Sequence, residues 1–372
     1  MFFSISKKEN TKFKNHFKVE DIFIDFDDSW EIFKDDNKIK ICKGYLEDFS
    51  NLNDENDYFS KKGNFCVIQI ENSQITIMHQ YFRTFPLYIG SFFVSNMPND
   101  EHSQCDEVKA DTYLTIEIEN FEIKSHKINN DYSIIQTTDY LKEVYDLLIQ
   151  KFLFLKNSKL DLKLFFSKGV DTGLAMSIMN KLEIPYELIL DEHISQCGLY
   201  DNILEISKDH YKFTTYKQIH HFDEKCILIS GVFGDDAFLR EVGQLSIYFR
   251  AKKINIYKFL NKDNRNYYYF NRKKLTDYFV DNLKRRVYNG DYVEDICNVM
   301  MNNHQHWHIN NTLTFTPFQD IEILRMTLGL SDEKLLDQIL NCNINIELIK
   351  MFDPNVLTII EKYKNFREGR DG

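Results

Sequence analysis

The stretch that most constrains the fold is Leu162–Leu182, LKLFFSKGVDTGLAMSIMNKL, because two different periodicities meet there across a short turn. Its first part, LKLFFS, is a short apolar run that favours a β-strand. From Val170 onward, apolar residues recur three or four positions apart, which is the period of an α-helix. Backbone N–H groups at the start of a helix lack partners and lie at the positive end of the helix dipole, so this turn is suited to bind a phosphate.

The turn, Ser167-Lys168-Gly169-Val170-Asp171-Thr172, resembles the pyrophosphate-binding loop Ser-Gly-Gly-x-Asp-Ser of the ATP pyrophosphatases, with Lys168 for one glycine and Thr172 for the last serine. It is not the P-loop consensus, because no glycine followed by Lys-Ser or Lys-Thr closes it. The resemblance implies cleavage of ATP between the α- and β-phosphates and activation of a substrate as its adenylate. For this motif alone, a plain strand–turn–helix unit is the alternative.

Beyond the turn, strand and helix patterns alternate along the chain. Strands are expected at 186–191, 212–219 and 225–231, with a helix at 198–210. Strands separated by helices imply a parallel sheet, so we predict an α/β fold for this half. In such sheets ligands bind outside the carboxyl ends of the strands, and the turn after Phe166 lies at one such end.

A second motif follows the strand at 225–231. The residues Ser230–Phe238, SGVFGDDAF, resemble the asparagine synthetase sequence Ser-Gly-Glu-Gly-Ala-Asp-Glu-Leu-Phe. Mg²⁺ prefers one or two carboxylates together with phosphate oxygens and water, so Asp171 and Asp235 are the predicted magnesium ligands. A helix N-cap is the alternative role for Asp235. The family glutamate is Val232 here, which argues against asparagine as the product.

The N-terminal half has a β pattern. Branched and aromatic residues dominate 63–72, 73–81 and 112–127. Between the last two, Arg83–Ile89 (RTFPLYI) resembles a stretch in the amidotransferase half of asparagine synthetases. That family's glutaminase uses a cysteine directly after the initiator methionine, whereas this chain has Phe2, and a benzyl group cannot attack an amide. We therefore expect a degenerate, Ntn-hydrolase-like remnant without glutaminase activity.

The resemblance implies two domains, a glutaminase-like domain at 1–132 and an ATP-binding domain at 133–372. Helical spacing over 140–155 follows a polar start signal and opens the second domain. Thr314–Asp320, TFTPFQD, resembles the family segment Pro-Phe-Leu-Asp, which precedes a similar helix. A late lysine assists breakdown of the adenylate in such families. Of the two candidates, Lys362 and Lys364, we favour Lys364, with a solvated tail charge as the alternative.

The predicted function is an ATP-dependent, AMP- and pyrophosphate-forming ligase that adenylates a carboxylate and joins it to an amine. β-Lactam synthetase and lasso-peptide cyclase are relatives whose nucleophile is a substrate nitrogen. The predicted catalytic residues are Asp171, Asp235 and Lys364, and the predicted cofactors are ATP and Mg²⁺. The residues predicted to bind the nucleotide are Ser167, Lys168, Gly169, Val170, Asp171, Thr172, Leu190, Gly231 and Asp236. A nucleotide-binding pseudoenzyme and a nucleic-acid-modifying ligase are the alternatives.

The resemblance implies small-molecule carboxylates and amines as partners, and composition bears on the other partner classes. The net charge of −11 argues against a surface that wraps nucleic acid, although basic aromatic stretches between 238 and 303 leave a local patch open. No run approaches the roughly 20 apolar residues of a membrane span, and the N-terminal stretch lacks the apolar core of a signal peptide. We expect a cytoplasmic protein, and a homodimer is left open.

Cysteine and histidine patterns do not favour a metal site. The seven cysteines include no C-x-x-C pair, so we expect buried, reduced thiols. His304, His306 and His308 would share one face of an extended segment. Because no paired Cys, Asp or Glu spacing supports zinc there, packing or substrate hydrogen bonding is the favoured role.

Overall fold

The computed structural model describes most of the predicted elements. The described residues are 3–10, 13–28, 30–35, 37–45, 64–79, 87–96, 105–108, 112–128, 133–167, 169–190, 211–213, 226–231, 234–238, 313–331, 334, 338 and 342–368. The chain divides into two compact units, the first made of Met1–Asp131, His220–Lys225 and Met301–Thr314, and the second made of Tyr132–Ile219, Cys226–Met300 and Phe315–Gly372. The domain limits 1–132 and 133–372 stay a prediction.

The first unit contains a six-stranded antiparallel sheet in the order β10-β8-β9-β1-β3-β2. Its strands are β1 (Phe3–Ser6), β2 (Asn15–Val19), β3 (Ile22–Phe26), β8 (Tyr88–Gly90), β9 (Phe93–Ser95) and β10 (Asp106–Glu107). Ile5 of β1 pairs with Ile24 on one side and with Val94 on the other, and all three side chains are buried. This row forms part of the core.

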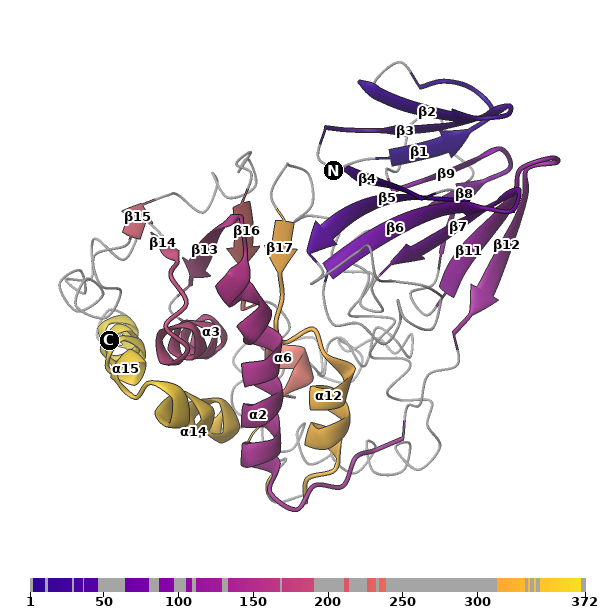
Figure 1. Cartoon of the computed structure of the whole chain (residues 1–372). Coiled ribbons are helices and arrows are strands. Elements are labelled where there is room, and N and C mark those ends of the chain that lie inside the picture. Colours follow the sequence, from indigo (N-terminus) through magenta and orange to yellow (C-terminus); the bar gives the residue numbers. More distant parts are fainter. Residues whose placement is uncertain are drawn as a thin grey trace, which may run out of the picture. The chain divides into compact units, whose positions relative to one another are not determined.

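A second six-stranded antiparallel sheet, in the order β12-β11-β7-β6-β5-β4, lies in the same unit (Figure 1). Its strands are β4 (Glu31–Asp35), β5 (Lys38–Tyr45), β6 (Asn64–Glu71), β7 (Gln74–His79), β11 (Thr112–Glu117) and β12 (Glu122–Lys127). Ile41, Ile68, Ile77 and Leu114 pair in one row across four strands, and all are buried. The predicted β character of 63–81 and 112–127 is confirmed over β6, β7, β11 and β12.

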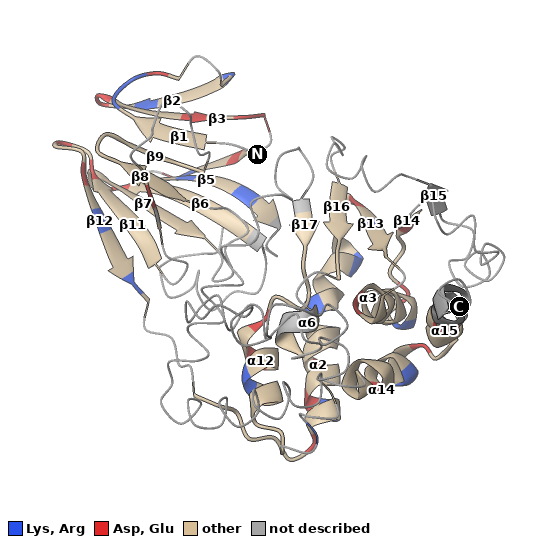
Figure 2. Cartoon of the chain, turned by 180° about the vertical axis from the view of Figure 1, so that it is seen from behind, with Lys and Arg blue, Asp and Glu red and all other residues tan. Residues whose placement is uncertain are grey.

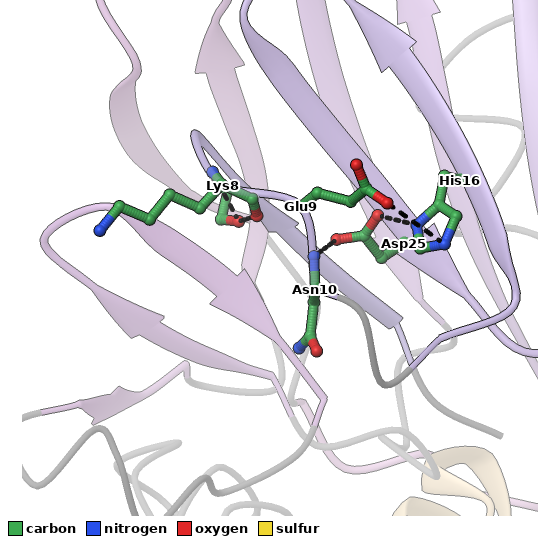
Figure 3. A network of polar contacts seen from close by, with 6 residues as sticks. Lys8, Glu9, Asn10, His16 and Asp25 are labelled. Carbon is green, nitrogen blue, oxygen red and sulfur yellow. Dashed lines mark hydrogen bonds and ion pairs between the residues drawn. The ribbon is translucent and has the colours of Figure 1, made fainter.

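A polar network ties the segment after β1 to the β2–β3 hairpin (Figure 3). The Asp25 carboxylate is fully buried, lies 2.7 Å from His16 Nδ1 and accepts the Asn10 N–H at 2.8 Å. On the other side of the ring, His16 Nε2 lies 3.7 Å from Glu9 Oε1. The hydrogen bond to Asp25 raises the pKa of His16, so the protonated imidazole stabilises this part of the fold.

The described cysteines are reduced, as predicted, and three of the five are buried. Cys42, Cys66 and Cys226 are buried, whereas Cys105 and Cys342 are partly exposed. Burial raises the pKa of the Cys42 thiol to about 12, which keeps it protonated near neutral pH. These buried thiols therefore act as small apolar side chains.

The third sheet has five strands in the order β15-β14-β13-β16-β17, and all of it belongs to the second unit except Leu313 and Thr314 of β17. Its strands are β13 (Asp161–Phe166), β14 (Glu187–Leu190), β15 (Tyr211–Phe213), β16 (Cys226–Ile229) and β17 (Leu313–Phe315). β13 pairs in parallel with both β14 and β16, and β14 pairs in parallel with β15. The predicted mixed α/β character and the parallel sheet in this half are confirmed.

The helices of the second unit are α2 (Tyr140–Leu153), α3 (Val170–Lys181), α6 (Gly234–Ala237), α12 (Ile321–Leu328), α14 (Asn343–Phe352) and α15 (Asn355–Glu368), with a 3₁₀ turn at Phe154–Asn157. α3 packs against α14, α15, α2 and β13 (Figure 1). Because α3 is covered on several sides, its side chains from Asp171 to Met179 are all buried.

The start of α2 follows the predicted signal. Asp139 caps the helix by accepting the Lys142 N–H at 3.3 Å, and the Glu143 carboxylate accepts the N–H groups of Thr138 and Asp139. This reciprocal arrangement satisfies backbone donors that the first turn would otherwise leave open. The α-helical part ends at Leu153, slightly before the predicted end at 155, because the chain tightens into the 3₁₀ turn.

In the described part of the chain, no helix combines the length and the apolar character that crossing a membrane requires.

Candidate nucleotide site at the switch point of the parallel sheet

The strand order of the parallel sheet defines where a ligand is expected. From β13 the chain continues to β14 and β15 on one side and then returns to β16 on the other side of β13. In open parallel sheets the crevice at such a reversal, outside the carboxyl ends of the strands, is the usual ligand site. β13 ends at Phe166 and β16 ends at Ile229, so both sequence motifs begin at this crevice.

The first motif forms a short loop and the first turn of α3. Gly169 is the N-cap of α3 with φ −82°, and the helix already includes Val170, Asp171 and Thr172. The predicted turn is therefore shorter than its six residues. The hydroxyl of Thr172 accepts the Ser167 N–H at 3.2 Å and donates to the Gly169 carbonyl at 3.2 Å. Ser167 Oγ lies 3.2 Å from the same hydroxyl. These bonds fix the loop with both hydroxyls next to the helix start.

Among the described residues, little stands where a side chain on Gly169 would lie. A Cβ built there meets Ser167 Oγ at 3.5 Å, which is an ordinary contact. The backbone angles also suit any L-residue, because φ is negative. Glycine is a good N-cap, and its bare Cα also leaves room for a ligand near the backbone.

The second motif packs directly against the first. A Cβ on Gly231 would lie 2.6 Å from the Thr172 nitrogen, and a Cβ on Gly234 would lie 2.2 Å from Asp171 Oδ1. Both glycines are needed for this close approach. The Ser230 N–H donates to the Phe315 carbonyl at 2.9 Å, which anchors the start of the motif to the end of β17.

The Asp171 carboxylate lies where the two motifs meet. Its residue is 9% exposed, and Oδ1 accepts the side-chain N–H of Asn345 at 3.2 Å. Asp235 and Asp236 belong to α6, directly after Gly234, but their side chains lie outside the described part of the structure. Asp235 follows Gly234, the glycine that approaches Asp171 closely. The pairing of the Asp171 and Asp235 carboxylates stays a prediction.

Of the other residues predicted from the sequence, the structure describes Leu190 and the backbone of Lys364. Leu190 is the last residue of β14 and is 1% exposed, so its contact with an adenine ring stays a prediction. Lys364 belongs to α15, which packs against α3, and its side chain is not described. The predictions that rest on Phe2, Arg83–Pro86, Lys168, Asp191, Val232, Phe233 and His304–His308 lie outside the described residues.

A buried ion pair holds the segment that resembles Pro-Phe-Leu-Asp. Lys151 of α2 forms an ion pair with Asp320 and donates to the Pro317 carbonyl at 2.9 Å. Asp320 also caps α12 by accepting the N–H of Glu322 at 2.7 Å. Phe318 packs against Phe238, the last residue of the second motif, with ring centroids 5.7 Å apart. The segment therefore braces the second motif, and sequence reasoning missed Lys151, which looks like an ordinary helix lysine.

The geometry is compatible with a magnesium–triphosphate group. Asp171 supplies one carboxylate, the chain position of Asp235 permits a second, and the start of α3 offers N–H donors beside two hydroxyls. Mg²⁺ is usually held by one or two carboxylates, with phosphate oxygens and water completing its shell. Within the described residues no group of three or more His, Cys, Asp or Glu side chains could hold a metal ion by itself.

A cavity of about 630 Å³ lies at the opposite end of the strands, where β13 and β14 begin. It is lined by residues at the start of β13 and β14, among them Asp161, Tyr186 and Glu187, together with Lys156 and Lys159. Because ligands of parallel sheets bind at the carboxyl ends, this cavity is distinct from the predicted nucleotide site.

Charge on the described surface is mixed. Figure 2 shows Lys and Arg interspersed with Asp and Glu over the drawn elements. The basic aromatic stretches between 241 and 303 lie outside the described residues.

Comparisons with known proteins yield only distant likenesses. No family model matches the chain, and no curated protein matches it. Among solved structures, the chain is similar to glutamine phosphoribosylpyrophosphate (PRPP) amidotransferase from B. subtilis complexed with ADP and GMP, at 11% identity over 56% of this chain and 59% of that chain, with a TM-score of 0.20. It is also similar to a structure titled as the allosteric regulatory enzyme of purine biosynthesis, at 13% identity over 56% of this chain and 58% of that one, with a TM-score of 0.22. The chain thus spans less than two thirds of either neighbour, and likeness at this level assigns neither fold nor function.

Proposed function

We propose that the chain is an ATP-dependent, AMP- and pyrophosphate-forming ligase that adenylates a carboxylate and joins it to an amine. In this proposal the second unit is an asparagine-synthetase-like ATP pyrophosphatase domain, and the first unit is an Ntn-hydrolase-like remnant. The observation that carries the proposal is the contact between the two motifs, in which Gly231 and Gly234 lie against Thr172 and Asp171 at the switch point of the sheet. Two loops far apart in sequence are thereby joined where a nucleotide is expected.

The roles of the binding residues follow from their chemistry. The Ser167 hydroxyl and the first N–H groups of α3 would donate to the leaving pyrophosphate, and the bare Cα of Gly169 would let it approach. The Thr172 hydroxyl, which donates to the Gly169 carbonyl in this structure, would have to turn from that carbonyl to donate to the same group. Asp171 and Asp235 would hold Mg²⁺, which screens the charge that develops on the phosphates. Gly231 would keep the second motif close enough for Asp235 to reach the same ion.

The acceptor is proposed to be an amine other than free ammonia. Phe2 follows Met1 in this sequence, and a benzyl group cannot attack an amide. The nucleophile would then be a nitrogen of a small-molecule substrate. Lys364, in the helix that packs on α3, is the proposed residue for adenylate breakdown.

Pyrophosphate release tests the proposal. The purified chain is incubated with ATP, Mg²⁺ and a panel of carboxylates and amines, and pyrophosphate and AMP are measured. Asp171→Asn should lower release by about 100-fold or more, because a magnesium ligand is lost. Asp353→Asn is the matched control, since Asp353 accepts an amide N–H between the far ends of α3 and α14.

The outcomes separate the candidate functions. Release that depends on a carboxylate and falls in Asp171→Asn supports the ligase. If the chain binds ATP but releases no pyrophosphate with any carboxylate, it is a nucleotide-binding protein that does not catalyse the reaction. Equal release from the wild type and Asp171→Asn would remove Asp171 from the mechanism.

A further inference from the structure

Two contacts between α3 and α14 resemble each other closely. At the start of both helices, Asn345 donates its side-chain N–H to Asp171 Oδ1 at 3.2 Å. At their ends, Asn180 donates its side-chain N–H to Asp353 Oδ2 at 2.8 Å. Because start meets start and end meets end, the two helices lie side by side in the same direction. One contact is at the predicted magnesium ligand, and the other is at the far end of the same helix pair.

The Asn345 amide is oriented by a chain of hydrogen bonds that begins at the backbone. The Ile344 N–H can only donate, and it donates to Gln338 Oε1 at 2.7 Å. The other end of that amide, Gln338 Nε2, therefore donates to Asn345 Oδ1 at 2.7 Å. Asn345 must then present its N–H₂ group to Asp171. The backbone thus fixes which way both amides face.

Burial makes this orientation costly to change. Gln338 and Asn345 are both 0% exposed, so water cannot replace either of their hydrogen bonds if it breaks. An unsatisfied buried polar group costs about 1–3 kcal/mol, and rotating either amide would create several. Gly234 lies close to the same carboxylate oxygen, since a Cβ on this glycine would be 2.2 Å from Asp171 Oδ1. The carboxylate therefore accepts from the Asn345 amide at a place where Gly234 leaves little room for it to shift.

We propose that Asn345, oriented by Gln338, is a positioning residue that holds the Asp171 carboxylate in the geometry needed to bind magnesium with the nucleotide. The inference rests on the proposed function, because it concerns the same ion. The amide of Asn345 carries no charge, so it directs the carboxylate through a hydrogen bond. Residues that orient metal ligands in this way typically change metal affinity by about 10- to 100-fold when they are replaced.

The test measures magnesium affinity directly. Magnesium is titrated by calorimetry into the full chain saturated with a non-hydrolysable ATP analogue, and thermal unfolding is recorded for each variant. Asn345→Leu should weaken magnesium binding by about 10- to 100-fold. Gln338→Met leaves Asn345 in place but frees its amide to rotate, so it should weaken binding less.

Asn180→Leu is the matched control. Asn180 is also braced, by the Tyr186 hydroxyl at 2.8 Å, and it also joins an aspartate between α3 and α14. Its loss should lower the melting temperature in the same way while leaving magnesium affinity unchanged. The pair of variants therefore separates loosening of the helix pair from misplacement of Asp171.

Kinetics add a second readout. Pyrophosphate release by Asn345→Leu should recover when magnesium is raised, because the ligand is still present, whereas Asp171→Asn should not recover. Equal magnesium affinity in Asn345→Leu and Asn180→Leu, with a wild type that binds magnesium and nucleotide, overturns this inference alone. A wild type that binds neither overturns the proposed function as well. If Asn345→Leu does not fold, the comparison of Gln338→Met with Asn180→Leu decides the question in the same way.

Discussion

Each unit buries an aspartate, and the two are held by different partners. Asp25 in the first unit is 0% exposed and contacts the ring of His16, which can carry a positive charge. Asp171 in the second unit is 9% exposed and accepts from the neutral amide of Asn345. An imidazolium neutralises a buried carboxylate and thereby stabilises the fold, whereas an amide only directs it. The comparison separates a structural carboxylate from one proposed to act on a cation.

The largest expected effect comes from Gly234→Ala. The new methyl group would lie 2.2 Å from Asp171 Oδ1, far inside van der Waals contact, so the carboxylate must move. We expect pyrophosphate release to fall by about 100-fold and the free energy of unfolding to fall by about 1–3 kcal/mol, as in other overpacked sites. Coupled-enzyme detection of pyrophosphate and urea unfolding measure the two changes. Unaltered release would mean that Asp171 need not stay where it is.

Asp25→Ala should act on stability alone. It removes the partner of His16 and of the Asn10 N–H, and we expect a loss of about 2 kcal/mol, at the low end for buried pairs because His16 is partly exposed. Urea unfolding measures the loss, and pyrophosphate release at a temperature where the variant is folded should equal that of the wild type. A selective loss of release would place Asp25 in the chemistry and end the contrast with Asp171.

Gly169→Ala should affect nucleotide binding more than stability. Among the described residues a Cβ there meets Ser167 Oγ at 3.5 Å, so no clash is expected, and the free energy of unfolding should fall by about 0.5–1 kcal/mol because alanine is a poorer N-cap than glycine. If pyrophosphate lies over this residue, the added methyl group should raise the KM for ATP by about tenfold, equivalent to about 1.4 kcal/mol. Steady-state kinetics at varied ATP measures the effect. An unchanged KM would show that no phosphate approaches Gly169.

The smallest expected effect is a pH dependence in the first unit. The pKa of His16 is raised above 6.5 in the folded chain, chiefly by its hydrogen bond to Asp25, and Glu9 faces the other side of the ring. The stabilisation is therefore fully present below about pH 6.5 and is lost as pH rises through the folded-state pKa. His16→Gln should cost up to about 1 kcal/mol at low pH and less at high pH.

The measurement is urea unfolding of the wild type and His16→Gln at about pH 5.5 and about pH 8.5. When both proteins also carry Asp25→Asn, the cost of His16→Gln should be the same at the two pH values. A cost that is equal at both pH values would show that the charge on His16 does not matter.

Local sequence patterns predicted the elements around the site but not the contacts between them. The switch in period after Phe166 identified β13 and α3, because apolar spacing is a local property. The two glycine motifs were found, yet their direct contact through Gly231 and Gly234 depends on strand order, which no local pattern contains.

The amide chain to Asp171 was missed for a related reason. Gln338 and Asn345 lie far from Asp171 in the sequence, and single amides carry no recognisable spacing. Lys151 was missed because a lysine in an amphipathic helix usually faces water, and its partner Asp320 is remote in the chain. Buried polar contacts of this kind arise from tertiary packing, so the structure was needed to find them.

The most direct test of the account is a crystal structure of the chain with Mg²⁺ and a non-hydrolysable ATP analogue. The account predicts one magnesium ion with oxygens of both Asp171 and Asp235 at about 2.1 Å, beside phosphates that contact Ser167 and Thr172. Carboxylates that face apart, or apolar side chains packed between them, would contradict it.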